Sequence, residues 1–330
     1  MSPDSSRNLE PVRLARRAMA TRFEIVLHGE DPTQLRRAGL AALAEVDEIE
    51  AQLSLFQPTS EISHINARAA LEPIRVTPPV FHLLQQAALL HQQTEGAFDI
   101  TIAPMVRCWG FMNGSGSWPD PAEVARVRQQ VGMQHVILDE ANFTVRFDRE
   151  GVMLDLGAIG KGYAIDRAAA TLREAGVTSA LLHGGTSTVY AIGRPPDQET
   201  WKVAVESPVE GAPRWLAMVP LRDAALSVSA VWGKSFQHEG KTFGHVLDPR
   251  SGQPVANAVL AAIALPSATE TDALSTALLV VGTGGHEKLA QLRPGMRTLV
   301  VSSGADNFRS ESKGISLKTP ENIVKAPPNV

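Results

Sequence analysis

The sequence contains a single cysteine and no long apolar run. Only Cys108 among the 330 residues is a cysteine, which excludes an intramolecular disulfide and is in keeping with a reducing compartment. No apolar stretch reaches the roughly 18 residues of a membrane helix, and no apolar signal-peptide core precedes the first strand-like segment. We therefore expect neither a signal peptide nor a membrane span, and we expect a cytoplasmic protein.

Positive charge is also scarce. The chain has 31 Lys and Arg against 35 Asp and Glu, for a net charge of −4, and it has no basic run outside its N-terminal segment. A nucleic-acid partner is therefore not expected. A hydrophobic content of 44% and a charged content of 20% are ordinary for a soluble globular protein with a substantial core.

Apolar periodicity predicts the fold class. Helical spacing over residues 32–53 and 78–95 indicates two early helices, whereas period-two alternation dominates between residues 135 and 230. Helices thus gather early and strands later, without βαβ alternation, which predicts an α+β protein. Residues 1–15 are expected to be a disordered lead and residues 313–330 a loose tail. Residues 16–312 then form one domain, either a single body or two intimate subdomains.

The segment "DLGAIGKGYAID" joins a strand-like stretch to a helix through a glycine-rich turn. Gly157, Gly160 and Gly162 permit close backbone approach, and a helix N-terminus presents free N–H groups to an anion. Lys161 adds a positive charge. The alternative is a tight turn that packs without a ligand. The segment is neither a Walker A nor a Rossmann motif.

The segment "ETDALSTALLVVG" places Asp272 and Thr276 four residues apart, and therefore on one face of a helix. A carboxylate and a hydroxyl are hard oxygen ligands suited to Mg²⁺, which binds few protein groups together with phosphates and water. Helix capping by Thr269, Thr271 or Asp272 is the alternative.

Three further stretches are ambiguous by themselves. Gly184 and Gly185 end a strand where either a ligand or a β-bulge fits. Asp99, after Phe98, is suited either to a ligand's polar edge or to capping a loop. His245, in "FGHVLDPRSGQPV", is either a reactive group or a polar residue satisfied in a turn.

Taken together in chain order, these segments resemble the ApbE family of FAD:protein FMN transferases. The resemblance runs from about Met19 to Gly285, through "MATRFEI", "LSLFQPTSEISHIN", "GAFDITIAPM", "DLGAIGKGYAID", "HGG", "ALSVSA", "HVLDPRSGQP" and "TDALSTAL". It implies an α+β, T-fold-related mixed sheet with packed helices and an FAD cleft between two subdomains. It also implies Mg²⁺-dependent transfer of FMN from FAD to a Thr or Ser hydroxyl of a target flavoprotein, with release of AMP.

The resemblance assigns roles to individual residues. Asp272, Thr276 and the carbonyl of Ala158 would bind Mg²⁺, and His245 would be the base that activates the acceptor hydroxyl. The residues matching FAD contacts are Met19, Phe56, Ala97, Phe98, Asp99, Lys161, Gly184, Gly185 and Ser229.

Four features depart from the family pattern. The segment "HGGTSTVYAIG" lacks the polar residue often found after the glycines, and "ALSVSAVWGKS" lacks the usual glycine and tyrosine-rich continuation. Phe56 stands where tyrosine is frequent, and Gly244 stands where many relatives have a second histidine beside His245. Two other activities remain open for the same residues: Mg²⁺-dependent hydrolysis of FAD to FMN and AMP, and FAD binding without turnover. The sequence defines neither the acceptor protein nor the oligomeric state.

Overall fold

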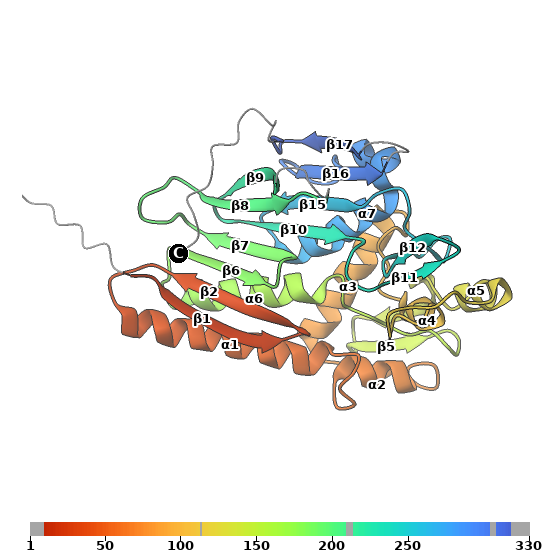
Figure 1. The fold of residues 1–330 in the computed structure, drawn as a ribbon. Coiled ribbons are helices and arrows are strands. Elements are labelled where there is room, and N and C mark those ends of the chain that lie inside the picture. The colour runs from red at the N-terminus through yellow and green to blue at the C-terminus, as the bar shows by residue number, and fades with distance from the viewer. Residues whose placement is uncertain (1–9, 113, 209–213, 304–307, 318–330) are drawn as a thin grey trace, which may run out of the picture.

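A computed structural model describes residues 10–112, 114–208, 214–303 and 308–317 (Figure 1). Its centre is an eight-stranded sheet in the order β1-β2-β6-β7-β10-β15-β16-β17, in which every neighbouring pair is antiparallel. The strands are β1 (Val12–Ala18), β2 (Thr21–Leu27), β6 (Ala180–Gly184), β7 (Thr188–Ile192), β10 (Ala224–Ala230), β15 (Leu260–Leu265), β16 (Arg297–Ser303) and β17 (Phe308–Lys313).

Three long helices cover one face of this sheet. They are α1 (Pro32–Leu53), α6 (Gly160–Glu174) and α7 (Ala268–Leu289), with α6 packed between the other two. The hairpin of β8 (Trp201–Glu206) and β9 (Trp215–Leu221) contributes Val205, Ala217 and Val219 to a second apolar cluster on the opposite face. Every residue of β15 is therefore buried, which explains the unbroken apolar run of this strand.

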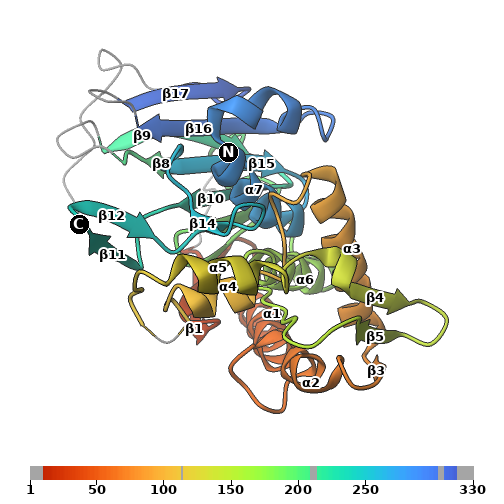
Figure 2. The same cartoon turned by 90° about the vertical axis from the view of Figure 1, so that its right-hand side faces the viewer.

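The remaining elements extend beyond one end of the sheet (Figure 1), the end that faces the viewer in Figure 2. They comprise α2 (Glu61–Arg68), α3 (Pro78–Gln93), α4 (Ala103–Cys108), α5 (Pro121–Arg128), the 3₁₀ turn Met133–His135, and the small sheet of β3 (Ile74–Arg75), β5 (Thr144–Phe147) and β4 (Val136–Asp139). Two further hairpins lie between β10 and β15 in the chain. They are β11 (Ser235–His238) with β12 (Lys241–Gly244), and β13 (Leu247–Asp248) with β14 (Gln253–Pro254).

The mixed helix and sheet architecture confirms the predicted α+β class. The expected disordered lead is wrong for residues 12–15, because β1 begins at Val12 and pairs along its whole length with β2. Residues 1–9 lie outside the described part of the chain. Similarly, Lys313 belongs to β17 and Ile315 is buried, so the expected loose tail is wrong for these residues; residues 318–330 are not described. Within the described residues, no helix has the length and apolarity required to cross a membrane.

Candidate active site

A cavity of about 1010 Å³ opens at the end of the sheet where α6 and α7 begin. It brings together most of the residues selected from the sequence, although they come from segments far apart in the chain. Those lining it are Phe56, Ala97, Phe98, Asp99, Ala158, Lys161, Ser229, His245, Asp272 and Thr276.

Met19, Gly184 and Gly185 do not line the cavity. Met19 lies in the β1–β2 turn with a φ of 49°, and Gly185 has a φ of 64° and donates its N–H to the Arg22 carbonyl. A Cβ on Gly185 would lie 2.3 Å from the side-chain atom Thr21 Oγ1, and the positive φ of residue 185 also favours glycine. Gly184 and Gly185 directly precede Thr186, and Thr186 does line the cavity.

Asp272, near the start of α7, is hydrogen-bonded to the N-terminus of α6. Its Oδ2 accepts a hydrogen bond from the Gly162 N–H at 3.0 Å, and the residue is only 4% exposed. A Cβ on Gly162 would lie 2.2 Å from the Ala268 carbonyl oxygen, so glycine allows α6 and α7 to touch here. The sequence-predicted turn therefore positions the carboxylate as well as presenting backbone N–H groups.

The start of α7 is fixed by a carboxylate from α6. Asp166 accepts hydrogen bonds from the Ser267 hydroxyl, the Ala268 N–H, and both the N–H and hydroxyl of Thr269, at 2.7 to 2.9 Å. These donors include N–H groups that a helix cannot satisfy internally. The contact sets the position of Asp272, one turn further along.

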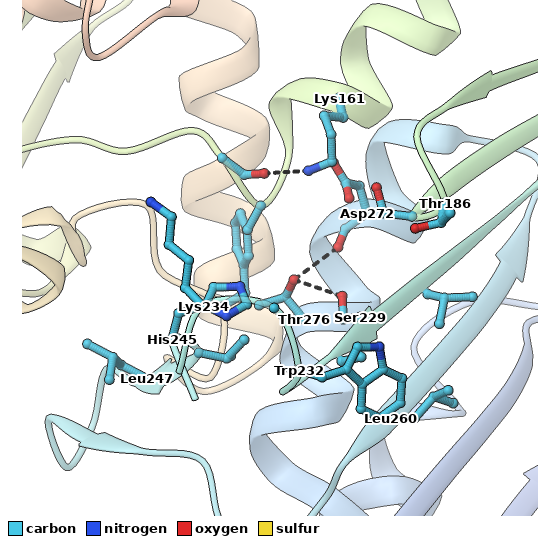
Figure 3. Close-up of a pocket in the computed structure, with 18 of the residues that line it drawn as sticks. Lys161, Thr186, Ser229, Trp232, Lys234, His245, Leu247, Leu260, Asp272 and Thr276 are labelled. Carbon is cyan, nitrogen blue, oxygen red and sulfur yellow. Dashed lines mark hydrogen bonds and ion pairs between the residues drawn. The ribbon is translucent and has the colours of Figure 1, made fainter. Parts of the chain in front are cut away.

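Oxygen atoms converge beside Asp272 (Figure 3). The Thr276 hydroxyl lies 3.2 Å from the Ser229 hydroxyl and 3.3 Å from the Asp272 carbonyl. Ala158, in the glycine-rich turn, lines the same cavity. One carboxylate and two hydroxyls lie together here, and such oxygen atoms fit Mg²⁺ completed by phosphate and water. The described residues contain no group of three or more His, Cys, Asp and Glu that could hold a metal.

Lys161 supplies positive charge next to these oxygens. Its Nζ lies 3.9 Å from Asp272 Oδ2 and donates a hydrogen bond to the Gly157 carbonyl at 2.9 Å. The ammonium therefore lies where a phosphate group bound in the cavity would be neutralised.

His245 has a buried nitrogen with no partner. Its Nδ1 makes no hydrogen bond within the described part of the chain, although buried polar atoms are normally satisfied. Burial lowers the pKa of His245 below its ordinary value of 6.5, and the charges of Lys234 and Lys161 lower it further against an opposing hydrogen-bond contribution from the Lys234 backbone. The imidazole is therefore neutral at neutral pH, which leaves one ring nitrogen able to accept a proton.

The segment around Asp99 is held by internal contacts. Asp99 Oδ1 accepts from the Thr101 N–H at 2.7 Å and from its hydroxyl at 2.6 Å, while Oδ2 lies 3.2 Å from His91 Nδ1. Burial opposes the charged form of His91, but Asp99 and the Phe98 carbonyl outweigh it and raise the pKa of His91. The carboxylate therefore holds the loop in shape, and Phe98 is buried in the main core beside it.

The sequence analysis missed Asp155 as a residue of the cavity. It lines the cavity, and its Oδ1 accepts from the Gly157 N–H at 2.8 Å. Burial raises the pKa of Asp155, against the opposing effects of the Gly157 hydrogen bond and the Lys161 charge. Its position in the sequence, directly before the glycine-rich turn, could have identified Asp155 as a cavity residue. Phe56, by contrast, was selected from the sequence and is 69% exposed at the cavity.

These features define a class of protein. An α+β fold encloses a cavity lined by a carboxylate, hydroxyls, a lysine and a histidine with a lowered pKa, which are groups of the kind used for displacement at phosphorus. The chain belongs to the ApbE family, whose model matches residues 19–300.

Curated relatives and solved structures also place the chain in the ApbE family. A FAD:protein FMN transferase from Salmonella typhimurium is 25% identical, over 89% of this chain and 85% of the relative, and one from Klebsiella pneumoniae is 31% identical, over 73% and 74%. The crystal structure of an ApbE protein from Thermotoga maritima matches with a TM-score of 0.83 at 26% identity, covering 92% of this chain and 97% of that one. The flavin transferase ApbE from Vibrio cholerae matches with a TM-score of 0.80 at 25% identity and the same coverage. The similarity in structure confirms the predicted ApbE-like fold.

Proposed function

We propose that the protein transfers FMN from FAD to a Ser or Thr hydroxyl of a target flavoprotein in a Mg²⁺-dependent reaction that releases AMP. The observation that carries this proposal is that His245, whose pKa is lowered by burial, lines the same cavity as Asp272, Thr276 and Lys161. Family membership and the names of the relatives support FAD as the donor and a protein as the acceptor.

The chemistry assigns each group a task. The acceptor oxygen forms a bond to the phosphorus of the FMN half of FAD, and the bond from this phosphorus to the bridging oxygen breaks. AMP leaves with the bonding electron pair, and the hydroxyl proton passes to His245. Lys161 neutralises phosphate charge. Asp272, Thr276 and the Ala158 carbonyl would hold Mg²⁺, which when bound supplies further charge neutralisation.

The cavity volume supports a dinucleotide ligand. About 1010 Å³ lies at the upper end of the range for small-molecule and cofactor sites, roughly 300–1,000 Å³. Apolar residues such as Val106, Leu247 and Val228 line the cavity together with the polar groups. Such a lining suits a ligand with a charged centre and flat aromatic ends.

A single experiment distinguishes this function from FAD hydrolysis and from simple binding. The protein is incubated with FAD, Mg²⁺ and a candidate flavoprotein acceptor domain, and AMP release and acceptor mass are followed together. A mass gain of one FMN with equimolar AMP supports transfer. AMP without a mass gain would assign the cavity to hydrolysis, and FAD binding without AMP would assign it to carriage.

A further inference from the structure

Three buried hydroxyls lie behind Asp272, on the side of its carboxylate that faces the sheet. Thr188 on β7, Ser227 on β10 and Thr271 on α7 are each 0% exposed. Thr188 and Ser227 lie directly opposite each other in the sheet register, and Thr271 directly precedes Asp272. Hydroxyl residues are mostly exposed in proteins, so three of them buried at one point require a common explanation.

The three hydroxyls form a continuous chain of hydrogen bonds that ends on Asp272. The oxygens of Thr271 and Ser227 are 2.8 Å apart, and the Ser227 hydroxyl donates to Thr188 Oγ1 at 3.1 Å. The Thr188 hydroxyl in turn donates to Oδ1 of Asp272 at 3.3 Å. The chain therefore connects two strands and a helix to a carboxylate that is itself only 4% exposed.

The number of hydrogens fixes the direction of this chain. Each hydroxyl has one hydrogen to donate, and an ionised carboxylate only accepts. The Thr188 hydrogen therefore goes to Asp272, and the Ser227 hydrogen goes to Thr188. The contact between Ser227 and Thr271 is then donated by Thr271, for which the Ala268 carbonyl at 3.0 Å is the other acceptor within reach. All three dipoles point toward the carboxylate, and hydrogen bonds in such a series strengthen one another.

The chain completes the orientation of the Asp272 carboxylate. Oδ2 accepts from the Gly162 N–H at 3.0 Å, whereas Oδ1 accepts from Thr188. Donors on both oxygens fix the rotation of the carboxylate plane, and each oxygen keeps a second lone pair for another partner. Outer hydrogen-bond partners of this kind orient metal-binding carboxylates in proteins.

Resting on the proposed function, we propose that Thr188 is a positioning residue for Mg²⁺ binding, through the hydrogen bond that its hydroxyl donates to Asp272. Thr188 is not among the residues that line the cavity, so its effect passes through Asp272. Ser227 and Thr271 orient the Thr188 hydroxyl in the same way. The carboxylate is thus held in one orientation before the metal binds, which raises the affinity for Mg²⁺ by reducing the ordering that binding requires.

The test removes the hydroxyl of Thr188 and keeps the shape of its side chain. In Thr188→Val a methyl group replaces the hydroxyl, so Oδ1 of Asp272 loses its donor. We expect the Mg²⁺ affinity, measured by calorimetric titration of MgCl₂ with and without FAD, to fall by about 10- to 100-fold. The Mg²⁺ concentration for half-maximal AMP release should rise by the same factor, whereas kcat at saturating Mg²⁺ stays nearly unchanged. Thr188→Ser keeps the hydroxyl and should restore the affinity.

Thr298→Val is the matched control. Thr298 on β16 is also 0% exposed, and its hydroxyl lies 2.7 Å from His286 Nε2, outside the residues that line the cavity. This variant should lower the melting temperature of the metal-free protein and leave its Mg²⁺ affinity unchanged. An equal loss of Mg²⁺ affinity in Thr298→Val, or an unchanged affinity in Thr188→Val, overturns the proposal.

A double-mutant cycle tests the chain behind Thr188. Ser227→Ala removes the donor to Thr188 and should weaken Mg²⁺ binding less than Thr188→Val does. The double variant should bind Mg²⁺ no more weakly than Thr188→Val alone, because both substitutions interrupt one chain. Additive losses would show that Ser227 acts by a separate route and overturn the chain. Should Thr188→Val not fold, Ser227→Ala decides the question: weaker Mg²⁺ binding supports the proposal, and unchanged binding overturns it.

Failure of the proposed function gives a different set of results. If the unmodified protein binds Mg²⁺ but neither transfers FMN nor releases AMP, the proposed function fails, and the calorimetric titrations still decide the role of Thr188. If the unmodified protein transfers FMN while all variants bind Mg²⁺ equally well, the positioning role alone fails. Absence of Mg²⁺ binding by the unmodified protein, with or without FAD, overturns both.

Discussion

The N–H of Gly162 donates a 3.0 Å hydrogen bond to Oδ2 of Asp272, joining the first turn of α6 to α7 across 110 residues of sequence. The glycine-rich turn and the acidic helix, two separate motifs in the sequence, are therefore parts of one site. Ala158, Lys161 and Thr276 line the same cavity as this contact. The predictions below test the separate groups of this site.

Asp272→Asn should abolish most Mg²⁺-dependent AMP release from FAD. The amide keeps the shape of the side chain but loses the negative charge that a divalent cation requires. We expect a decrease on the order of 100-fold or more at saturating Mg²⁺. Glu270→Gln removes a charge from the same helix at a residue paired with Arg293, so it should retain activity. Full activity in Asp272→Asn would remove this residue from metal binding.

His245→Gln should separate binding from chemistry. Loss of a general base costs roughly 10²- to 10⁴-fold in rate, whereas FAD affinity, measured by flavin fluorescence, should change little. His64→Gln, at an exposed histidine of α2, is the matched control. Wild-type rates of acceptor flavinylation in His245→Gln would show that another group takes the proton.

The pH profile should report the neutral state of His245. Because the pKa of His245 is lowered in the free enzyme, the base is present at neutral pH and is lost only as pH falls through that pKa, so the acidic limb of kcat/KM lies below 6.5. Lys234→Met removes one of the charges that lower this pKa. The acidic limb should therefore move to higher pH, toward 6.5, in single-turnover measurements between pH 5 and 8. A limb that stays in place would show that it belongs to another group.

Local patterns in the sequence predicted the helices α1, α3, α6 and α7 and several cavity-lining segments, but not the helices α2 and α4 or the long-range contacts. The spacing of Asp272 and Thr276 was sufficient to place both on one helix face, and both line the cavity. Residues 151–156 have a strand pattern but form no strand, since Asp155 instead donates its N–H to the Ile100 carbonyl. That hydrogen bond depends on tertiary packing, which the apolar periodicity of the sequence does not reveal.

The missed strand β1 has a similar cause. Its hairpin turn places Met19 and Ala20 at positive φ, 49° and 57°, where glycine or asparagine is normally expected. No sequence signal marked the turn, although pairing with β2 satisfies the backbone of the whole strand. The turn follows from sheet pairing rather than from local preference.

Gly162→Ala should destabilise the protein and impair Mg²⁺ binding together. The new Cβ would lie 2.2 Å from the Ala268 carbonyl oxygen and 2.8 Å from Asp272 Cβ, so the helices must separate. We expect a loss of about 1–3 kcal/mol in the free energy of unfolding, with a weaker dependence of activity on Mg²⁺. Gly284→Ala, in α7 with nothing within 4 Å of its Cβ, should instead stabilise by about 0.5–1 kcal/mol. Equal melting temperatures for the two variants would contradict the close packing.

Asp166→Ala should weaken Mg²⁺ binding although Asp166 is not a proposed ligand. The substitution leaves the donors at the start of α7 without their carboxylate, so we expect a loss of about 1–3 kcal/mol in stability and a displaced Asp272. Asp31→Ala is the matched control, because Asp31 caps α1 through the N–H groups of Thr33 and Gln34. It should lower the melting temperature but leave the Mg²⁺ concentration for half-maximal AMP release unchanged. If both variants shift that concentration equally, the effect is one of global stability, and Asp166 does not position the metal site.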